Sequence, residues 1–111
     1  MKNLAFTVNL KDDPAIIEKY QEYHANVWPE VLDALKKVGV IDMKIFILGR
    51  RLFMYSEVED DFDPEVNFPR YLSLSPVCQE WEDLMSTFQE PVKDAKDGEK
   101  WAQMKQIFQL P

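Results

Sequence analysis

The chain has few of the side chains on which disulfides, metal centres and thiol chemistry depend. Its 111 residues include a single cysteine, Cys78, and a single histidine, His24. One cysteine allows no internal disulfide, and this Cys and His, far apart in the sequence, lack the spacing of a zinc site. The acidic residues form no calcium-loop pattern either. We therefore expect no disulfide and no bound metal, and we expect a reducing, cytoplasmic location.

Glycine and basic side chains are also scarce. With 3 glycines there is no glycine-rich cradle for nucleotide phosphates. The 20 acidic and 13 basic side chains give a formal net charge of −7, which repels nucleic acid and anionic membranes. No apolar run approaches the roughly 20 residues that span a bilayer, and the N-terminal residues lack a signal-peptide core. We expect neither nucleic acid nor a membrane as a partner.

What the chain does contain is enough apolar surface for one folded domain over residues 1–111, since 46% of its residues are hydrophobic. Alternating apolar residues predict strands, and Asp-Pro or Ser-Pro pairs followed by helical spacing predict helix starts. Pro29 predicts a break at 24–28 in the first helix, and Pro69 predicts that a short helical turn after Asp63 stops before it. The predicted elements are a strand at 4–10, a helix at 14–38, strands at 40–48 and 52–58 joined by a turn at 49–51, a loop at 59–74, a helix from 76 that ends before Pro91, and a strand at 101–110.

This order, β-α-β-β-α-β, is that of the α+β ferredoxin-like folds. It predicts a four-stranded antiparallel sheet with both helices on one face. The strands carry more large apolar side chains than one face needs, which predicts that a second copy covers the other face. We therefore expect a homodimer of the dimeric α/β-barrel type.

His24 is the first candidate for acid–base chemistry, because imidazole titrates near neutral pH. It lies in a stripe of apolar residues at helical spacing, where burial lowers the pKa of an imidazole. Tyr20 precedes it by four residues and so projects from the same helical patch. The alternative is that both side chains belong to the core, with their polar atoms hydrogen-bonded to the backbone.

Other candidates have stronger structural alternatives. Trp81 could stack on the apolar face of a sugar ring, but it also occupies a core position of its helix. Cys78 has no basic neighbour to activate it and fits a small buried side chain better than a nucleophile. A last group has the polar atoms to orient a base or to bind hydroxyl groups, yet fits a solvated face equally well: Glu30, Asp33, Tyr71 and Glu82.

Three segments together resemble the L-rhamnose mutarotase family. The most specific is 20–30, which contains the run His24-Ala-Asn-Val-Trp28-Pro29-Glu30. Residues 77–81 and 107–111 match later parts of the family pattern in the same order. The resemblance implies a ferredoxin-like homodimer that needs no cofactor and interconverts the α and β anomers of a free 6-deoxyhexose. It also implies that His24 is the proton donor and that Tyr20 and Trp81 bind the sugar.

Two positions depart from the family pattern. Members that act on rhamnose have a second Trp where this chain has Glu82, and a Tyr where it has Met43. Both positions belong to the sugar pocket, so L-fucose or another deoxysugar competes with L-rhamnose as the substrate.

Anomer exchange proceeds by opening the pyranose to the aldehyde, rotating about C1–C2 and closing the ring again. We expect His24 to protonate the ring oxygen while Tyr20 or a water takes the anomeric proton. Two other functions remain open on the same fold: a small dimeric α/β-barrel monooxygenase, and a sugar-binding dimer without catalysis.

Overall fold

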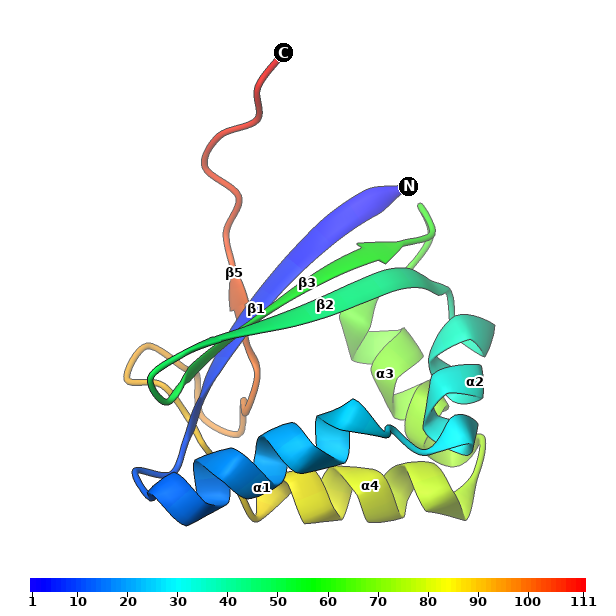
Figure 1. The fold of residues 1–111 in the computed structure, drawn as a ribbon. Helices are drawn as coiled ribbons and strands as arrows, with labels where there is room; N and C mark the ends of the chain where they lie inside the picture. Colours follow the sequence, from blue (N-terminus) through cyan, green and yellow to red (C-terminus); the bar gives the residue numbers. More distant parts are fainter.

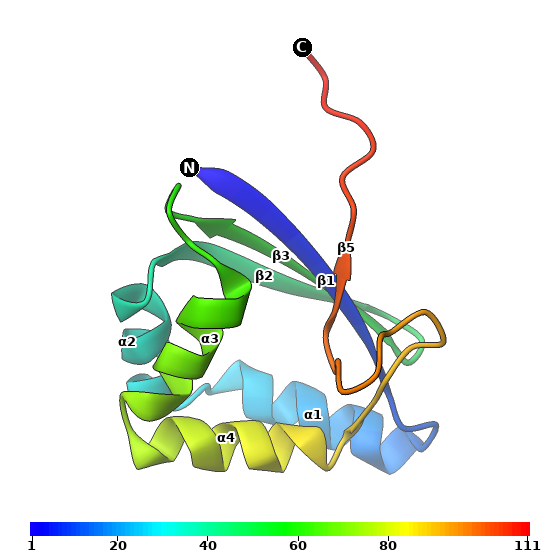
Figure 2. The same cartoon turned by 180° about the vertical axis from the view of Figure 1, so that it is seen from behind.

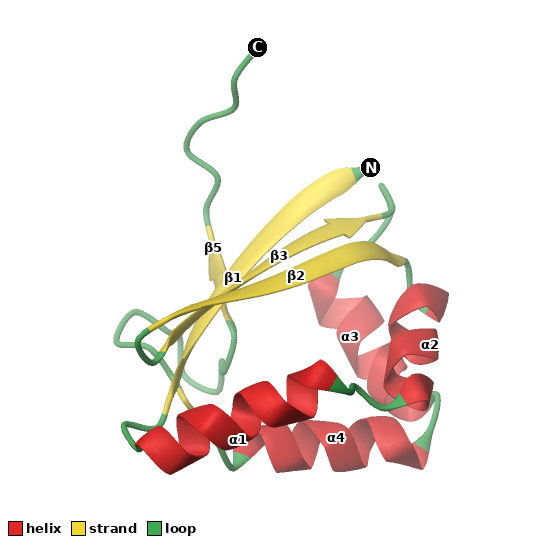
Figure 3. Cartoon of the chain, in the orientation of Figure 1, coloured by secondary structure: helices red, strands yellow, loops and turns green.

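The fold is a single antiparallel sheet with every helix packed on one of its faces. The computed structural model describes all 111 residues. Figure 1 and Figure 3 show the helices below the sheet, and the view from behind in Figure 2 shows nothing covering the other face. The elements, in chain order, are β1 (Lys2–Leu10), α1 (Pro14–Ala25), α2 (Pro29–Lys37), β2 (Val40–Leu48), β3 (Arg51–Val58), α3 (Pro64–Ser73), α4 (Pro76–Ser86), β4 (Gln89–Glu90) and β5 (Ala102–Met104).

The sheet has the order β2-β3-β1-β4, and β5 also pairs with β1. Every pairing is antiparallel. β5 pairs with residues 5–7 of β1 and β4 with residues 9–10, so together they occupy the place of the expected fourth strand. The α+β ferredoxin-like arrangement is confirmed, with five strands in place of four.

Three helices begin at the proline caps that the sequence predicts. Asp13 Oδ1, Asp63 Oδ1 and Ser75 Oγ each accept a hydrogen bond from the backbone N–H two residues later, at 2.9, 3.0 and 3.2 Å. A proline follows each cap at the first helical position, where a missing N–H has no cost. The predicted break before Pro29 is confirmed, because α1 ends at Ala25 and α2 begins at Pro29.

The prediction of one short turn before Pro69 is wrong, since α3 has 10 residues and contains Pro69. Tertiary contacts outweigh the hydrogen bond that Pro69 cannot donate. Phe68 packs edge-on against Phe62 and Phe6, with ring centroids 5.3 and 6.0 Å apart. Asn67 Nδ2 also donates a hydrogen bond to the Val38 carbonyl at 2.8 Å, which joins α3 to the end of α2.

The predicted strand at 101–110 is wrong beyond Met104. Pairing with β1 ends where Met104 lies opposite Ala5. Residues 105–111 then leave the sheet, as Figure 2 shows, and find no neighbouring strand. The alternation of apolar residues is real, but a strand forms only where a second strand accepts its hydrogen bonds.

The two faces of the sheet differ in burial. The inner face supplies the most completely buried side chains of the strands, Val8, Leu10, Leu52, Ser56 and Val58. On the outer face Phe46 and Phe53 stack with ring centroids 6.1 Å apart and remain 55% and 36% exposed.

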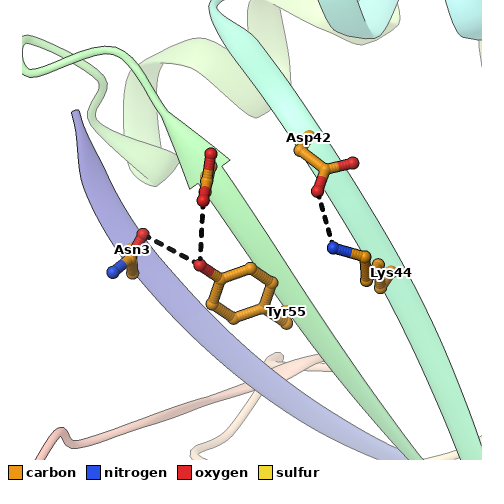
Figure 4. A network of polar contacts seen from close by, with 5 residues as sticks. Asn3, Asp42, Lys44 and Tyr55 are labelled. Carbon is orange, nitrogen blue, oxygen red and sulfur yellow. Dashed lines mark hydrogen bonds and ion pairs between the residues drawn. The ribbon is translucent and has the colours of Figure 1, made fainter.

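Polar groups occupy another part of the outer face (Figure 4). The Tyr55 hydroxyl lies 3.2 Å from Asn3 Oδ1 and 3.2 Å from Glu57 Oε1, and Lys44 Nζ lies 2.9 Å from Asp42 Oδ2.

Candidate active site

The space between the sheet and the helices contains a cavity of about 630 Å³. That volume suits a small-molecule ligand. Of its 23 lining residues 15 are hydrophobic, and they come from the inner face of the sheet, from all four helices and from the segment before β5. The cavity brings together all five residues that the sequence predicts for the sugar site: Tyr20, His24, Met43, Trp81 and Glu82.

The break between α1 and α2 places His24 in the last turn of α1, beside the cavity. The His24 and Tyr20 rings stack, with centroids 4.3 Å apart and an angle of 27° between their planes. Nδ1 of His24 lies 2.9 Å from the backbone oxygen of Tyr20. Because a carbonyl can only accept, Nδ1 carries the proton of this hydrogen bond, and in the neutral ring Nε2 keeps a free lone pair.

Burial favours the neutral forms of both side chains. It lowers the pKa of His24 below 6.5, against the opposing effect of the hydrogen bond to Tyr20. It raises the pKa of the Tyr20 phenol to about 12, although a hydrogen bond from Gln89 acts in the opposite direction. At neutral pH the cavity therefore holds an imidazole that can accept a proton and a phenol that can donate a hydrogen bond.

Trp81 lies in the core and also lines the cavity, so its position fits both predictions. It is 6% exposed and belongs to the buried core. Three rings pack edge-on around it, with centroids 6.2 Å away for Tyr23, 5.4 Å for His24 and 5.1 Å for Trp28. It also lines the cavity, so the core packing holds one flat aromatic wall in place.

The two positions that depart from the family pattern both lie at the cavity. Met43 is on β2, opposite Ser56 of β3. Glu82 follows Trp81 on α4, and burial raises the pKa of its carboxyl group while the charge of Lys100 opposes this shift. A carboxyl group of raised pKa in an apolar cavity can accept hydrogen bonds from hydroxyl groups when ionised, and it can donate a proton when neutral.

The structure also adds polar residues that the sequence does not single out. Gln89, Glu99, Lys100 and Gln103 line the cavity. Residues 93–100 have the pattern of a charged connector, and only the tertiary fold brings its end to the cavity. No local pattern could have marked Gln89, because its burial depends on the pairing of β4 with β1.

The remaining sequence candidates divide into two groups. Tyr71 lines the cavity, and burial raises the pKa of its phenol well above 10. Cys78 is fully buried beside it, with a thiol pKa raised by burial, as expected of a structural cysteine. Glu30 and Asp33 are exposed and do not reach the cavity.

No group of three or more His, Cys, Asp and Glu side chains is arranged to hold a metal ion. None of the four helices has the length and hydropathy needed to cross a membrane.

A mostly apolar cavity with one titratable imidazole and a few polar side chains is suited to a small molecule and to proton transfer. Comparison with known proteins gives the family. Residues 3–110 match the family model described as L-rhamnose mutarotase. The chain belongs to the L-rhamnose mutarotase family.

Named relatives agree with this assignment. An L-fucose mutarotase of Xanthomonas campestris is 38% identical over 112 residues, covering 99% of this chain and 89% of the relative. An L-rhamnose mutarotase of Enterococcus faecalis is 32% identical over 94 residues, covering 83% and 84%. The crystal structure of an L-rhamnose mutarotase from Formosa agariphila matches all of both chains with a TM-score of 0.70 at 24% identity, and this likeness supports the fold. The monooxygenase alternative is therefore not favoured.

Proposed function

We propose that this protein is an isomerase that interconverts the α and β anomers of L-rhamnose, L-fucose or a related 6-deoxyhexose without a cofactor. The observation that supports it most is one cavity that gathers His24, Tyr20, Trp81 and Glu82. Trp81 offers an apolar ring face for the C–H face of a sugar, and the polar side chains offer partners for its hydroxyl groups. The family match and the relatives named as mutarotases support the same activity.

His24 is the proton-transfer residue of this proposal. Its Nδ1–H is held by the Tyr20 carbonyl, so Nε2 is the atom that exchanges a proton with the sugar. Because burial lowers the pKa of His24, the ring rests in its neutral form and first acts as a base. We therefore assign it the anomeric proton, in place of the ring-oxygen proton that the sequence alone favours.

The reaction balances without any further reactant. Nε2 of His24 removes the proton of the anomeric hydroxyl, the C1–O5 bond breaks, and O5 takes a proton from neutral Glu82 or from water. The open aldehyde rotates about C1–C2. Ring closure reverses the transfers, and the imidazolium of His24 returns its proton to the carbonyl oxygen. Positioned proton transfers of this kind contribute about 10²–10⁴-fold each.

The choice of sugar depends on Glu82 and Met43. A carboxyl group replaces the second Trp of rhamnose-acting members, and a thioether replaces a Tyr hydroxyl. The relative named for L-fucose covers more of this chain, at higher identity, than the Enterococcus relative named for L-rhamnose. We therefore place L-fucose beside L-rhamnose as a substrate to be tested first.

Saturation-transfer NMR tests the activity directly. Exchange between the anomers of each sugar is measured with and without the native protein. Acceleration of either sugar supports the proposal, whereas no acceleration of L-rhamnose, L-fucose or other 6-deoxyhexoses rejects it. A protein that binds these sugars without accelerating exchange is the non-catalytic sugar-binding dimer.

The pH dependence tests the direction of proton transfer. If neutral His24 is the base, kcat/KM after subtraction of the protein-free rate is constant near pH 7. It falls about tenfold for each pH unit below the lowered pKa of His24. A rate that rises as the pH falls through this region assigns His24 to the donor role instead.

We also propose that the protein is a homodimer joined through the outer face of the sheet. The stacked Phe46 and Phe53 rings form an exposed apolar patch there. Residues 105–111 extend beyond the sheet, and Ile107 and Phe108 are 90% and 71% exposed. A second copy of the chain would cover these apolar side chains. Sedimentation equilibrium tests this, and a monomer at micromolar concentration contradicts it.

We also propose that the protein is located in the cytoplasm. The one cysteine, Cys78, is buried and unpaired, which suits a reducing compartment. Fractionation of cells that express the natural gene, followed by immunoblotting, tests the location.

A further inference from the structure

Gln89 is the one side chain at the cavity wall that leaves a buried polar atom unused. It lies in β4, opposite Leu10 of β1, and is 6% exposed. Its Nε2 donates a hydrogen bond of 3.3 Å to the Tyr20 hydroxyl oxygen. Its Oε1 is buried and has no hydrogen-bond partner. Unpartnered buried acceptors are rare in folded proteins because their desolvation is costly. A bound ligand that donates a hydrogen bond to this atom would remove that cost.

The hydrogen bond between these side chains also determines how Tyr20 can act. Because the Tyr20 oxygen accepts the Nε2–H of Gln89, its own O–H proton is free to be donated elsewhere. Both side chains line the cavity. A free hydrogen-bond donor on Tyr20 therefore lies beside a free acceptor on Gln89.

We propose that Gln89 is a substrate-binding residue, and that one ring hydroxyl of the sugar lies between the Tyr20 hydroxyl and Gln89 Oε1. This hydroxyl accepts the Tyr20 O–H and donates its own proton to Gln89. Gln89 Nε2, the Tyr20 hydroxyl and the sugar hydroxyl then form a closed ring of hydrogen bonds, in which each bond polarises the next. The inference rests on the proposed function, because it assumes that the ligand is a sugar.

The arrangement demands a group that both donates and accepts. A methyl group, a hydrogen or a fluorine at the same ring position leaves Gln89 Oε1 unpartnered. Gln89 thus makes the site selective for sugars with a hydroxyl at one particular carbon. This selectivity is separate from the selectivity that Glu82 provides.

Deoxyfluoro sugars test the proposal. Analogues of the accepted sugar with fluorine in place of the hydroxyl at C2, C3 or C4 are compared in native protein and in Gln89→Met, which keeps the side-chain length but neither donates nor accepts strongly. In native protein one position should lower kcat/KM about tenfold more than the other two. In Gln89→Met the parent sugar should lose about tenfold, and the analogue at that one position should lose nothing further.

The controls separate this role from a structural one. Gln79→Met changes an exposed glutamine on α4 and should leave the analogue series as in native protein. Thermal denaturation checks that each variant is folded. Equal losses for every analogue in native protein and in Gln89→Met overturn the proposal.

A second measurement needs no variant. The ¹⁵N–¹H resonances of the Gln89 side-chain amide should shift when the parent sugar is added and stay in place with the one critical analogue. If native protein accelerates no sugar, the proposed function fails. The amide titration still decides whether Gln89 binds a sugar hydroxyl, and resonances that never respond overturn the inference.

Discussion

The two faces of one sheet show how differently neighbouring residues of the same strands can be used. Along β3 the inner residues Met54 and Ser56 are buried, whereas Phe53, between Leu52 and Met54, is open to the outer face. The cavity lies next to the inner face. There burial raises the pKa values of Tyr20 and Glu82 and lowers that of His24, which favours the neutral form of each group.

The outer face shows the opposite electrostatics. The hydrogen bond between Lys44 and Asp42 lowers the pKa of the Asp42 carboxyl group and raises that of the lysine, so both charged forms are favoured (Figure 4). Water solvates these groups, and an ion pair there needs no other compensation. We therefore assign proton transfer near neutral pH to the inner face, and we propose that association uses the outer face.

Loss of the imidazole should give the largest effect. His24→Ala removes the group that we assign to proton transfer, so anomer exchange should fall about 10²–10⁴-fold in saturation-transfer NMR. Gln21→Ala, on the exposed side of the same helix, is the control and should keep the native rate. A folded His24→Ala protein that exchanges sugar at the native rate removes His24 from the mechanism.

A charge introduced on the outer face should weaken dimerisation. Phe46→Glu places a charge in the patch that a second copy is proposed to cover, and should weaken association about thirtyfold or more by sedimentation. Val66→Glu changes an apolar residue of α3 that is 61% exposed and should leave association unchanged. Equal dimerisation of the two variants would place the interface elsewhere.

Glu82 should set the preference between sugars. Glu82→Gln keeps the size of the side chain but replaces its carboxyl group with an amide, so the ratio of the L-rhamnose and L-fucose rates should change about tenfold or more. The neighbouring Asp83→Asn changes an exposed carboxylate and should leave the ratio as it is. An unchanged ratio in Glu82→Gln would show that the carboxylate does not contact the discriminating hydroxyl.

The same change, from Tyr to Phe, can be made on each side of the sheet. The variant on the outer face, Tyr55→Phe, should have the smallest effect on the exchange rate. Tyr20→Phe removes a hydroxyl from the inner side and should slow exchange about tenfold. Tyr55→Phe removes a hydroxyl from the outer face and should leave the exchange rate within twofold of native, since Tyr55 does not line the cavity. Similar losses in both variants would contradict the division of roles between the faces.

Local sequence signals were sufficient wherever one residue type decides the backbone. The cap residues Asp13, Asp63 and Ser75 predicted helix starts, Pro29 predicted the break between α1 and α2, and Gly39, with φ of 104°, marks the end of the second helix. The helical spacing of Tyr20 and His24 likewise predicted that their rings would lie side by side.

The failures of prediction have a common cause. Pro69 should have ended α3, but Phe68 packs against aromatic residues from two other parts of the chain. Residues 105–110 alternate as a strand does, but no strand lies beside them. In both places the outcome depends on neighbours that are distant in sequence.

The sequence by itself determined the starts of α1, α3 and α4 and the break between α1 and α2, because these depend on residue type at one place in the chain. Spacing along one helix likewise marked His24 and Tyr20 as candidates, and the family resemblance added the sugar-binding role predicted for Trp81. Only the tertiary structure decided that Gln89 meets Tyr20, and that Glu99, Lys100 and Gln103 share one cavity with these residues. These features require segments as far apart as α1 and β4 to pack together. Burial and hydrogen bonding, which then set the protonation of each group, follow from that packing.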